Sequence, residues 1–419
     1  MKAVGIHVFA GGFSHGVQQV ADVTDHLEVH GFGVETAKAM CNVNIHNSSA
    51  KDWPDIPADF AFGNPRCTGF STVTAGYDDT IHGPFAACTR DIWEFMDYCT
   101  GKYPIFTWES VQQAYSTGKP LIDMLVQKVA AQGYRVAHLF VNAASLGNAQ
   151  YRKRYFFVAY DGSKPFNISP MTLPEYAPTL YDAIWHMRDR TDMSLTKLSP
   201  DEQDCLARLP NGWDLNMLAQ YDCDHLPERM QDTWLMRNSG MPFSMHCVKR
   251  LSWQRPCPTI FSSAGRFIHP DHHRGLTHEE LATIMGLPIV PLGNDPVPQI
   301  AKGVCPCVGE WVAEQAYHYL NDAWGGEDWE AKYRDGWVTS SSVGKTEKVF
   351  NLTAYLQTRH RNFEDETFPR YRFNVDRRTG EPIQSWSSIA KSHRRNTGHT
   401  RLRSTLDVDY SDLADEPAS

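Results

Sequence analysis

The segment around Cys67 has residue types that suit nucleophilic chemistry. Residues 59–71 read DFAFGNPRCTGFS, so the cysteine follows a short apolar run and lies in a loop rich in Gly and Pro. Ligands bind beyond the carboxyl ends of strands in doubly wound sheets, where a cysteine is well placed to attack one. The neighbouring Arg66 would lower the pKa of the thiol and favour the thiolate. The alternative is an inert, buried cysteine.

Further polar residues adjoin other apolar runs. Glu109 follows the run at 104–108, and Gln150, Arg152 and Arg154 precede the run at 155–159. A buried glutamate can hold a proton, and arginine presents a fixed fork of hydrogen-bond donors. Taken alone, Glu109 could equally be a surface acid, and the two arginines a solvated strand edge.

The first residues of the chain favour a nucleotide cofactor. An apolar run at 4–9, then Gly11 and Gly12, then a helical pattern at 16–23 place backbone N–H groups at the start of a helix. Glu35 follows a second apolar run, at 32–34, and stands 24 residues after Gly11, where a ribose-binding carboxylate is expected. The two glycines lack the full GxGxxG pattern, so many α/β folds share this signal.

Short apolar runs alternate with helical patterns through the first third of the chain. Strands are predicted at 4–9, 32–34, 60–62, 104–108 and 155–159, and helices at 16–23 and 121–132. Such alternation predicts an α/β fold with a doubly wound, mostly parallel sheet. The rhythm is lost at 186–258, and helical patterns return at 277–285 and 308–320.

The overall composition is that of a globular protein. A hydrophobic content of 42% with 21% charged residues excludes disorder of the whole chain and a fibrous class. No apolar run approaches the roughly 18 residues of a membrane span, so we expect a soluble protein with no membrane partner. The ten cysteines are too few for a disulfide scaffold and indicate a reducing compartment. They also lack the CxxC spacing of a zinc knuckle, so no metal site is expected.

Charge is distributed unevenly along the chain. The formal net charge of −9 argues against broad attraction to nucleic acid. Residues 341–405 reverse this balance, with 13 Lys+Arg against 6 Asp+Glu and aromatic residues between them, and residues 407–419 carry five acids. The basic stretch is either a solvated tail or an arm that contacts a nucleic acid backbone.

Six segments, in order, resemble motifs of the DNA (cytosine-5)-methyltransferase family over most of the first 325 residues. One such segment would be a weak signal, but six in the family's order are specific. They are GNPRCTGFS at 63–71, WESV at 108–111, QYRKR at 150–154, DAI at 182–184, PTI at 258–260 with RGLTHEELATIMGLP at 274–288, and QIAKGVCP at 299–306.

The resemblance implies a Rossmann-like fold of S-adenosylmethionine-dependent methyltransferases with a second, smaller target-recognition domain. It places the catalytic, cofactor-binding domain at 1–185 and the target-recognition domain at 186–290. The final motif and a helix that packs back on the catalytic domain would occupy 291–325. The extension at 326–419, basic and then acidic, is not explained by the family and is expected to be partly disordered.

The resemblance also implies roles for single residues. Cys67 would add as a thiolate to carbon 6 of a flipped-out cytosine, and Glu109 would supply a proton or hydrogen bond to ring nitrogen 3. Arg152 and Arg154 would hold the base and the loop. Cofactor contacts are expected at Phe9, Ala10, Gly11, Gly12, Phe13, Glu35, Asn64, Pro65, Lys302 and Val304, and DNA contacts at Arg66, Ser71, Gln150 and Arg274.

The chain departs from the family's pattern at four places. The opening FAGG is two residues shorter than the family's FxGxGG loop, and Arg66 replaces the proline before the nucleophile. Thr68 and Ser110 replace a glutamine and an asparagine, and Ala301-Lys302 replaces Gly-Asn in the final motif. A lysine at that last position could pair with a carboxylate near the reactive end of the cofactor.

The primary expectation is therefore a DNA cytosine-5 methyltransferase of a bacterium or phage. It would use S-adenosylmethionine, act on double-stranded DNA as a monomer in the cytoplasm, and leave any restriction endonuclease to a separate chain. One alternative is a carboxymethyltransferase that uses carboxy-S-adenosylmethionine through Lys302. Others are an RNA cytosine methyltransferase and a non-catalytic DNA-binding relative.

Overall fold

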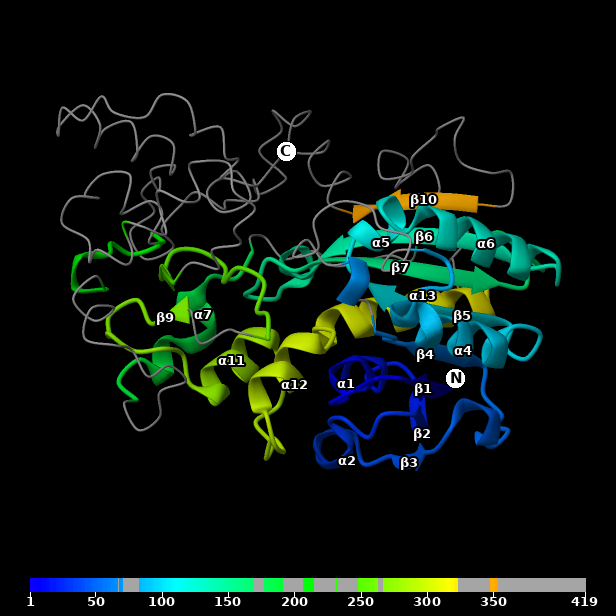
Figure 1. The fold of residues 1–419 in the computed structure, drawn as a ribbon, viewed down its shortest axis with the longest axis horizontal. Coiled ribbons are helices and arrows are strands. Elements are labelled where there is room, and N and C mark those ends of the chain that lie inside the picture. Colours follow the sequence, from blue (N-terminus) through cyan, green and yellow to red (C-terminus); the bar gives the residue numbers. More distant parts are fainter. Residues whose placement is uncertain are drawn as a thin grey trace, which may run out of the picture.

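An eight-stranded sheet forms the centre of the protein (Figure 1). The computed structural model describes residues 1–66, 68–70, 83–168, 177–190, 206–214, 231, 248–262, 267–322 and 347–352. In these ranges the strand order is β10-β6-β7-β5-β4-β1-β2-β3. The strands are β1 (Lys2–Ile6), β2 (Asp22–Glu28), β3 (Asn44–Asn47), β4 (Phe60–Gly63), β5 (Ile105–Ser110), β6 (Arg135–Asn142), β7 (Lys153–Tyr160) and β10 (Glu347–Asn351).

One strand of this sheet runs against the others. β7 pairs antiparallel with both β5 and β6, whereas every other neighbouring pair is parallel. The predicted doubly wound, mostly parallel sheet is thus confirmed. The direction of β7 brings its first residues to the carboxyl ends of β5 and β6, which is the edge where α/β sheets bind ligands.

Helices cover both faces of the sheet. α1 (Gly12–Val17), α2 (Val34–Cys41) and α13 (Pro306–Asn321) lie on one face, and α4 (Arg90–Cys99), α5 (Gln113–Ser116) and α6 (Lys119–Ala130) lie on the other. Alternate residues of each strand point to opposite faces. In β7, for example, Phe156 and Val158 belong to one hydrophobic cluster and Phe157 and Ala159 to the other.

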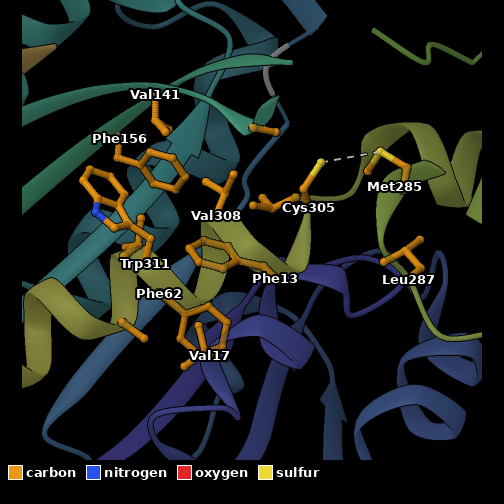
Figure 2. Packing of buried hydrophobic residues seen from close by; sticks show 14 of the residues in the cluster. Phe13, Val17, Phe62, Val141, Phe156, Met285, Leu287, Cys305, Val308 and Trp311 are labelled. Carbon is orange, nitrogen blue, oxygen red and sulfur yellow. Dashed lines mark hydrogen bonds between the residues drawn. The ribbon is translucent and has the colours of Figure 1, made fainter. Parts of the chain in front are cut away.

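Two glycines let α13 pack closely against α1. A Cβ atom on Gly16 would lie 2.1 Å from the carbonyl oxygen of Pro306, and one on Gly309 would lie 2.7 Å from that of Phe13. No other residue fits at such a backbone approach. Figure 2 shows the apolar core beside this contact, where Trp311 of α13 lies near Phe156. α13 therefore packs against α1 and the adjoining sheet, while the predicted bounds of this segment, 291–325, stay predictions.

A smaller group of elements lies apart from the sheet, on the left of Figure 1. It contains α7 (Leu180–Ile184), α11 (His278–Met285) and a two-stranded sheet of β8 (Lys249–Arg250) and β9 (Phe267–Ile268). The short α12 (Pro296–Lys302) follows α11. None of the helices in the ranges given above is long and apolar enough to span a membrane. The proposed domain boundaries at 185 and 290 stay predictions.

The expected strand at 32–34 and helix at 16–23 are wrong. The second strand is β2, and α2 already begins at Val34. Because β2 starts with the exposed Asp22 and continues through the polar residues Thr24 and Asp25, its apolar signal is weak. The strands at 60–62, 104–108 and 155–159 and the helices at 121–132, 277–285 and 308–320 are confirmed within a few residues.

Part of the C-terminal extension completes the sheet. β10 lies in register beside β6, and Val349, Phe350 and Leu352 are buried. Glu347 Oε2 lies 2.8 Å from Nε2 of the buried His138 in β6. The basic residues after 352 lie outside the described residues.

A truncation at residue 340 should therefore destabilise the eight-stranded sheet. Loss of β10 exposes its apolar contacts and leaves His138 without Glu347, so the free energy of unfolding should fall by about 3 kcal/mol or more. Denaturant unfolding would measure this change. A truncation after residue 352 is the matched control, because it removes most of the extension but keeps β10. Equal midpoints for the two truncations would contradict the prediction.

Candidate active site

The carboxyl ends of β4, β5 and the start of β7 bring polar side chains together. Gly63 at the end of β4 is in register with Trp108 of β5, and Ser110 at the end of β5 is in register with Tyr155 of β7. Glu109 and Arg154 consequently lie on neighbouring strands. Arg154 Nε is 2.5 Å from Glu109 Oε1.

This Glu109–Arg154 pair is largely removed from solvent. The Glu109 side chain is 3% exposed and that of Arg154 is 11% exposed. Burial raises the pKa of Glu109, although the charges of Arg154 and Arg152 pull it down. A carboxyl group with a raised pKa retains its proton to higher pH and can act as a proton donor. Glu109 is therefore a buried acid in contact with a cation, and not a surface residue.

Arg152 lies deeper and joins three parts of the chain. Its guanidinium donates hydrogen bonds to the carbonyl oxygens of Ile260 at 3.1 Å, Ala301 at 2.5 Å and Gly303 at 2.8 Å. Only 2% of the residue is exposed. In this arrangement Arg152 holds the final motif against the start of β7, and its predicted contact with the base stays a prediction.

Gln150 lies beside Arg152, in the same joint between the start of β7, the segment around Ile260 and the final motif. Its Oε1 accepts a hydrogen bond from Ile260 N at 3.1 Å, and its Nε2 donates to Met285 Sδ. Its side chain is fully buried, so a contact with DNA would require the joint to open. Arg274 is likewise engaged, with two 2.8 Å hydrogen bonds to the carboxylate of Glu280. Both residues are buried in this structure, and their predicted DNA contacts stay predictions.

The segment that leads to Cys67 is held from two sides. Asn64 Nδ2 donates to the carbonyl oxygen of Lys302 at 2.9 Å, and Pro65 is buried. Arg66 forms two hydrogen bonds with Asp91 in α4. Cys67 itself and Ser71 lie outside the described residues, so their predicted roles stay predictions.

The turn after β1 has the shape expected of a cofactor loop. Gly11 has φ +93°, a left-handed conformation that favours glycine, and α1 begins at Gly12. Ala10 is buried in this turn, and Val304 is buried beside Gly12. The ring of Phe13 packs in the core, with its centroid 4.8 Å from that of Phe62, and its predicted cofactor contact stays a prediction.

Glu28 is a buried acid beside the turn after β1, at a position that the sequence did not single out. It ends β2, is 4% exposed, and its Oε1 accepts a 2.7 Å hydrogen bond from Val8 N in the cofactor turn. Burial raises its pKa to about 8. Glu35, the predicted ribose ligand, lies on α2 with its side chain 80% exposed, beside Lys38. The available sequence signal was an acidic residue at the end of the second strand. It was missed because that strand was predicted at 32–34 and not at Asp22–Glu28.

Lys302 lies near the aromatic rings that flank the turn after β1. Its Nζ is 4.5 Å from the ring centroid of Phe32, which in turn contacts the ring of Phe9 edge to face. The residue is exposed, and its backbone oxygen is the acceptor for Asn64. The final motif thus meets both the cofactor turn and the segment before Cys67.

The residues around the turn after β1 fit an adenosyl cofactor. A glycine turn follows β1, a buried carboxyl group ends β2, and aromatic rings flank the turn. No group of three or more His, Cys, Asp or Glu side chains within the described ranges is arranged to hold a metal ion. Sheet order, antiparallel β7 and this edge together define a Rossmann-like methyltransferase.

The particular family follows from comparison with known proteins. The family model of C-5 cytosine-specific DNA methylases matches residues 3–316, and the chain belongs to this family. The recognition made from the six motifs is therefore confirmed.

Two curated relatives and one solved structure are informative. Type II methyltransferase M.DdeI of Desulfomicrobium norvegicum is 24% identical over 340 residues, which are 69% of this chain and 79% of the relative. A protein provisionally named type II methyltransferase M.MJ0563P, of Methanocaldococcus jannaschii, is 24% identical over 345 residues, 75% of this chain and 98% of the relative.

The solved structure supports the fold. It is an Escherichia coli protein provisionally described as a DNA modification methyltransferase encoded within a prophage. It superposes with a TM-score of 0.54 at 19% identity and covers 77% of this chain and 99% of its own.

Proposed function

We propose that this member of the C-5 cytosine methylase family transfers a methyl group from S-adenosylmethionine to carbon 5 of a flipped-out cytosine in double-stranded DNA. The observation that carries the proposal is the buried Glu109–Arg154 pair beside the strand end that leads to Cys67. It would act as a monomer in the cytoplasm of a bacterium or phage-infected cell, with any restriction endonuclease on a separate chain.

The chain's own residues would activate the ring in two ways. The Cys67 thiolate adds to carbon 6, and the Glu109 carboxyl group delivers its proton to ring nitrogen 3 as negative charge develops there. Arg154 then stabilises the Glu109 carboxylate that remains. The bound cofactor supplies the methyl group as an electrophile. Loss of the carbon 5 proton to water and of the Cys67 thiolate restores the aromatic ring. Ring nitrogen 3 returns its proton to the Glu109 carboxylate, so both residues regain their starting states.

A product analysis tests this function. The purified protein is incubated with duplex DNA or with tRNA, each with S-adenosylmethionine or carboxy-S-adenosylmethionine, and the nucleosides are identified by mass spectrometry. We expect methylcytosine from duplex DNA, and no product from Cys67→Ala. Product from tRNA alone would indicate the RNA enzyme, and carboxymethylcytosine would indicate the Lys302 alternative. No product from any pair would favour a non-catalytic DNA-binding protein.

Cofactor affinity distinguishes the two candidate ribose ligands. Glu28→Gln should weaken binding of S-adenosylmethionine by about tenfold or more, because the variant loses a buried carboxyl acceptor. Glu35→Gln is the matched control and should leave the affinity unchanged, since its side chain points to solvent. Titration calorimetry measures both. A weaker complex for Glu35→Gln alone would restore the original assignment.

The same carboxyl group should also make stability depend on pH. With a pKa of about 8 in the folded protein against an ordinary value of 4.5, Glu28 binds its proton more tightly when folded. The free energy of unfolding should therefore fall by a few kcal/mol as the pH rises between those values. Denaturant unfolding of cofactor-free Glu28→Gln should lack this part of the slope. An unchanged slope would contradict the burial of the charge.

A further inference from the structure

Arg66 occupies the position immediately before Cys67, where the resembled family has a proline. A proline ring fixes the backbone φ angle and so restricts the start of the loop that follows. Arginine imposes no such restriction by itself. The structure shows which contact restrains this position instead.

Two nitrogens of the Arg66 guanidinium donate hydrogen bonds to the two oxygens of one carboxylate, that of Asp91. Its Nε donates to Asp91 Oδ2 at 2.6 Å and its Nη2 donates to Asp91 Oδ1 at 2.9 Å. Two parallel hydrogen bonds fix the orientation of the planar guanidinium as well as its distance. The chain between the partners contains Cys67, so the contact links the residue before the nucleophile to the helix that follows the loop.

The Asp91 side chain is buried in the protein. It is 1% exposed and lies in the first turn of α4. Burial would raise the pKa of this carboxyl group, but the hydrogen bonds from Arg66, together with the charges of His7 and Arg66, hold it below its ordinary value. A buried carboxylate without its cation is costly, so the two residues depend on each other.

The Asp91 carboxylate also contacts a residue that follows the carboxyl end of β2. His30, two residues beyond β2, places Nε2 3.4 Å from Asp91 Oδ1, and its ring stacks on that of His7 after β1. The nearby Arg90 is 4.0 Å from Asp91 and 3.6 Å from Glu94. Arg66 therefore makes the closest charged contact with Asp91 among the neighbours named here.

We propose that the Arg66–Asp91 pair replaces the family's proline in positioning the start of the nucleophile loop, which makes Asp91 a positioning residue for methyl transfer. The inference rests on the proposed function. It also changes the role expected for Arg66: the guanidinium is neutralised by Asp91 and acts through geometry, and not as a free cation for a DNA phosphate or for the thiol.

A double-mutant cycle tests the pair. Wild type, Asp91→Asn, Arg66→Pro and the double variant are compared by kcat, by KM for cofactor and DNA, and by the rate of covalent complex formation on a duplex containing 5-fluorocytosine. Each single variant should lower kcat and the adduct rate by about tenfold or more with little change in the KM for cofactor. The double variant carries the family's proline and no buried charge, so it should be faster than either single variant.

Arg66→Lys separates geometry from charge. It keeps the positive charge but loses the fork, so its adduct rate should fall with that of Asp91→Asn. A wild-type rate in Arg66→Lys, or losses that simply multiply in the double variant, would overturn the proposal. A wild type that modifies no cytosine would instead overturn the proposed function, and the positioning role would fall with it. Thermal unfolding of each variant identifies losses caused by unfolding.

Discussion

Glu109→Gln is expected to lower kcat by about 10²-fold to 10⁴-fold, the range typical of removing a general acid. Glutamine has nearly the same shape and keeps a hydrogen-bonding oxygen, so the buried site should remain filled. It has no acidic proton to deliver to the ring, and it cannot become the carboxylate that Arg154, 2.5 Å from Glu109 Oε1, would stabilise after proton transfer. Single-turnover methyl transfer measures the effect on chemistry directly.

Two comparisons make this result decisive. Glu35→Gln removes an exposed carboxylate from the same domain and should leave kcat unchanged. Wild-type activity should fall as the pH rises above the pKa of Glu109, which burial raises, because only the protonated group can donate. A Glu109→Gln variant with wild-type kcat would remove Glu109 from the reaction.

Arg152→Ala is expected to lower the free energy of unfolding by about 3 kcal/mol or more, because it leaves several buried carbonyl oxygens without a donor. These acceptors belong to Ile260, Ala301 and Gly303, so the final motif and the smaller group of elements would separate from β7 together. Urea unfolding followed by tryptophan fluorescence measures the loss.

Arg135→Ala is the matched control for that variant. Arg135 begins the neighbouring strand β6 and is exposed, so its removal should change stability by no more than about 0.5 kcal/mol. Equal unfolding midpoints for the two variants would show that the contacts of Arg152 contribute little. A loss of activity in a folded Arg152→Ala protein would instead indicate a direct role at the base.

The strands around the candidate site could be predicted because their sequence signals are local. The apolar runs of β4, β5 and β7 are short and continuous because these strands are buried on both faces, and the polar residues next to them are Glu109, Arg152 and Arg154. The order of the motifs then identified the family.

Other features depend on pairings between distant residues and carry no local signal. The direction of β7 is a property of the sheet, and the partner of Arg66 stands 25 residues away in a helix. The acidic residues of β2 hid that strand, and with it Glu28. Two residues predicted to contact DNA lie inward: Gln150 accepts a hydrogen bond from Ile260 N, and Arg274 donates to Glu280.

The position of β10 has a consequence for how the chain folds during synthesis. Glu347 is 209 residues beyond its partner His138, so β6 emerges from the ribosome long before the strand that covers it. Until then the unpaired backbone of β6 forms an open sheet edge, which is a template for pairing with other chains. The nascent protein is therefore most exposed to aggregation in the interval before residue 352 is made, and chaperone binding should be strongest there.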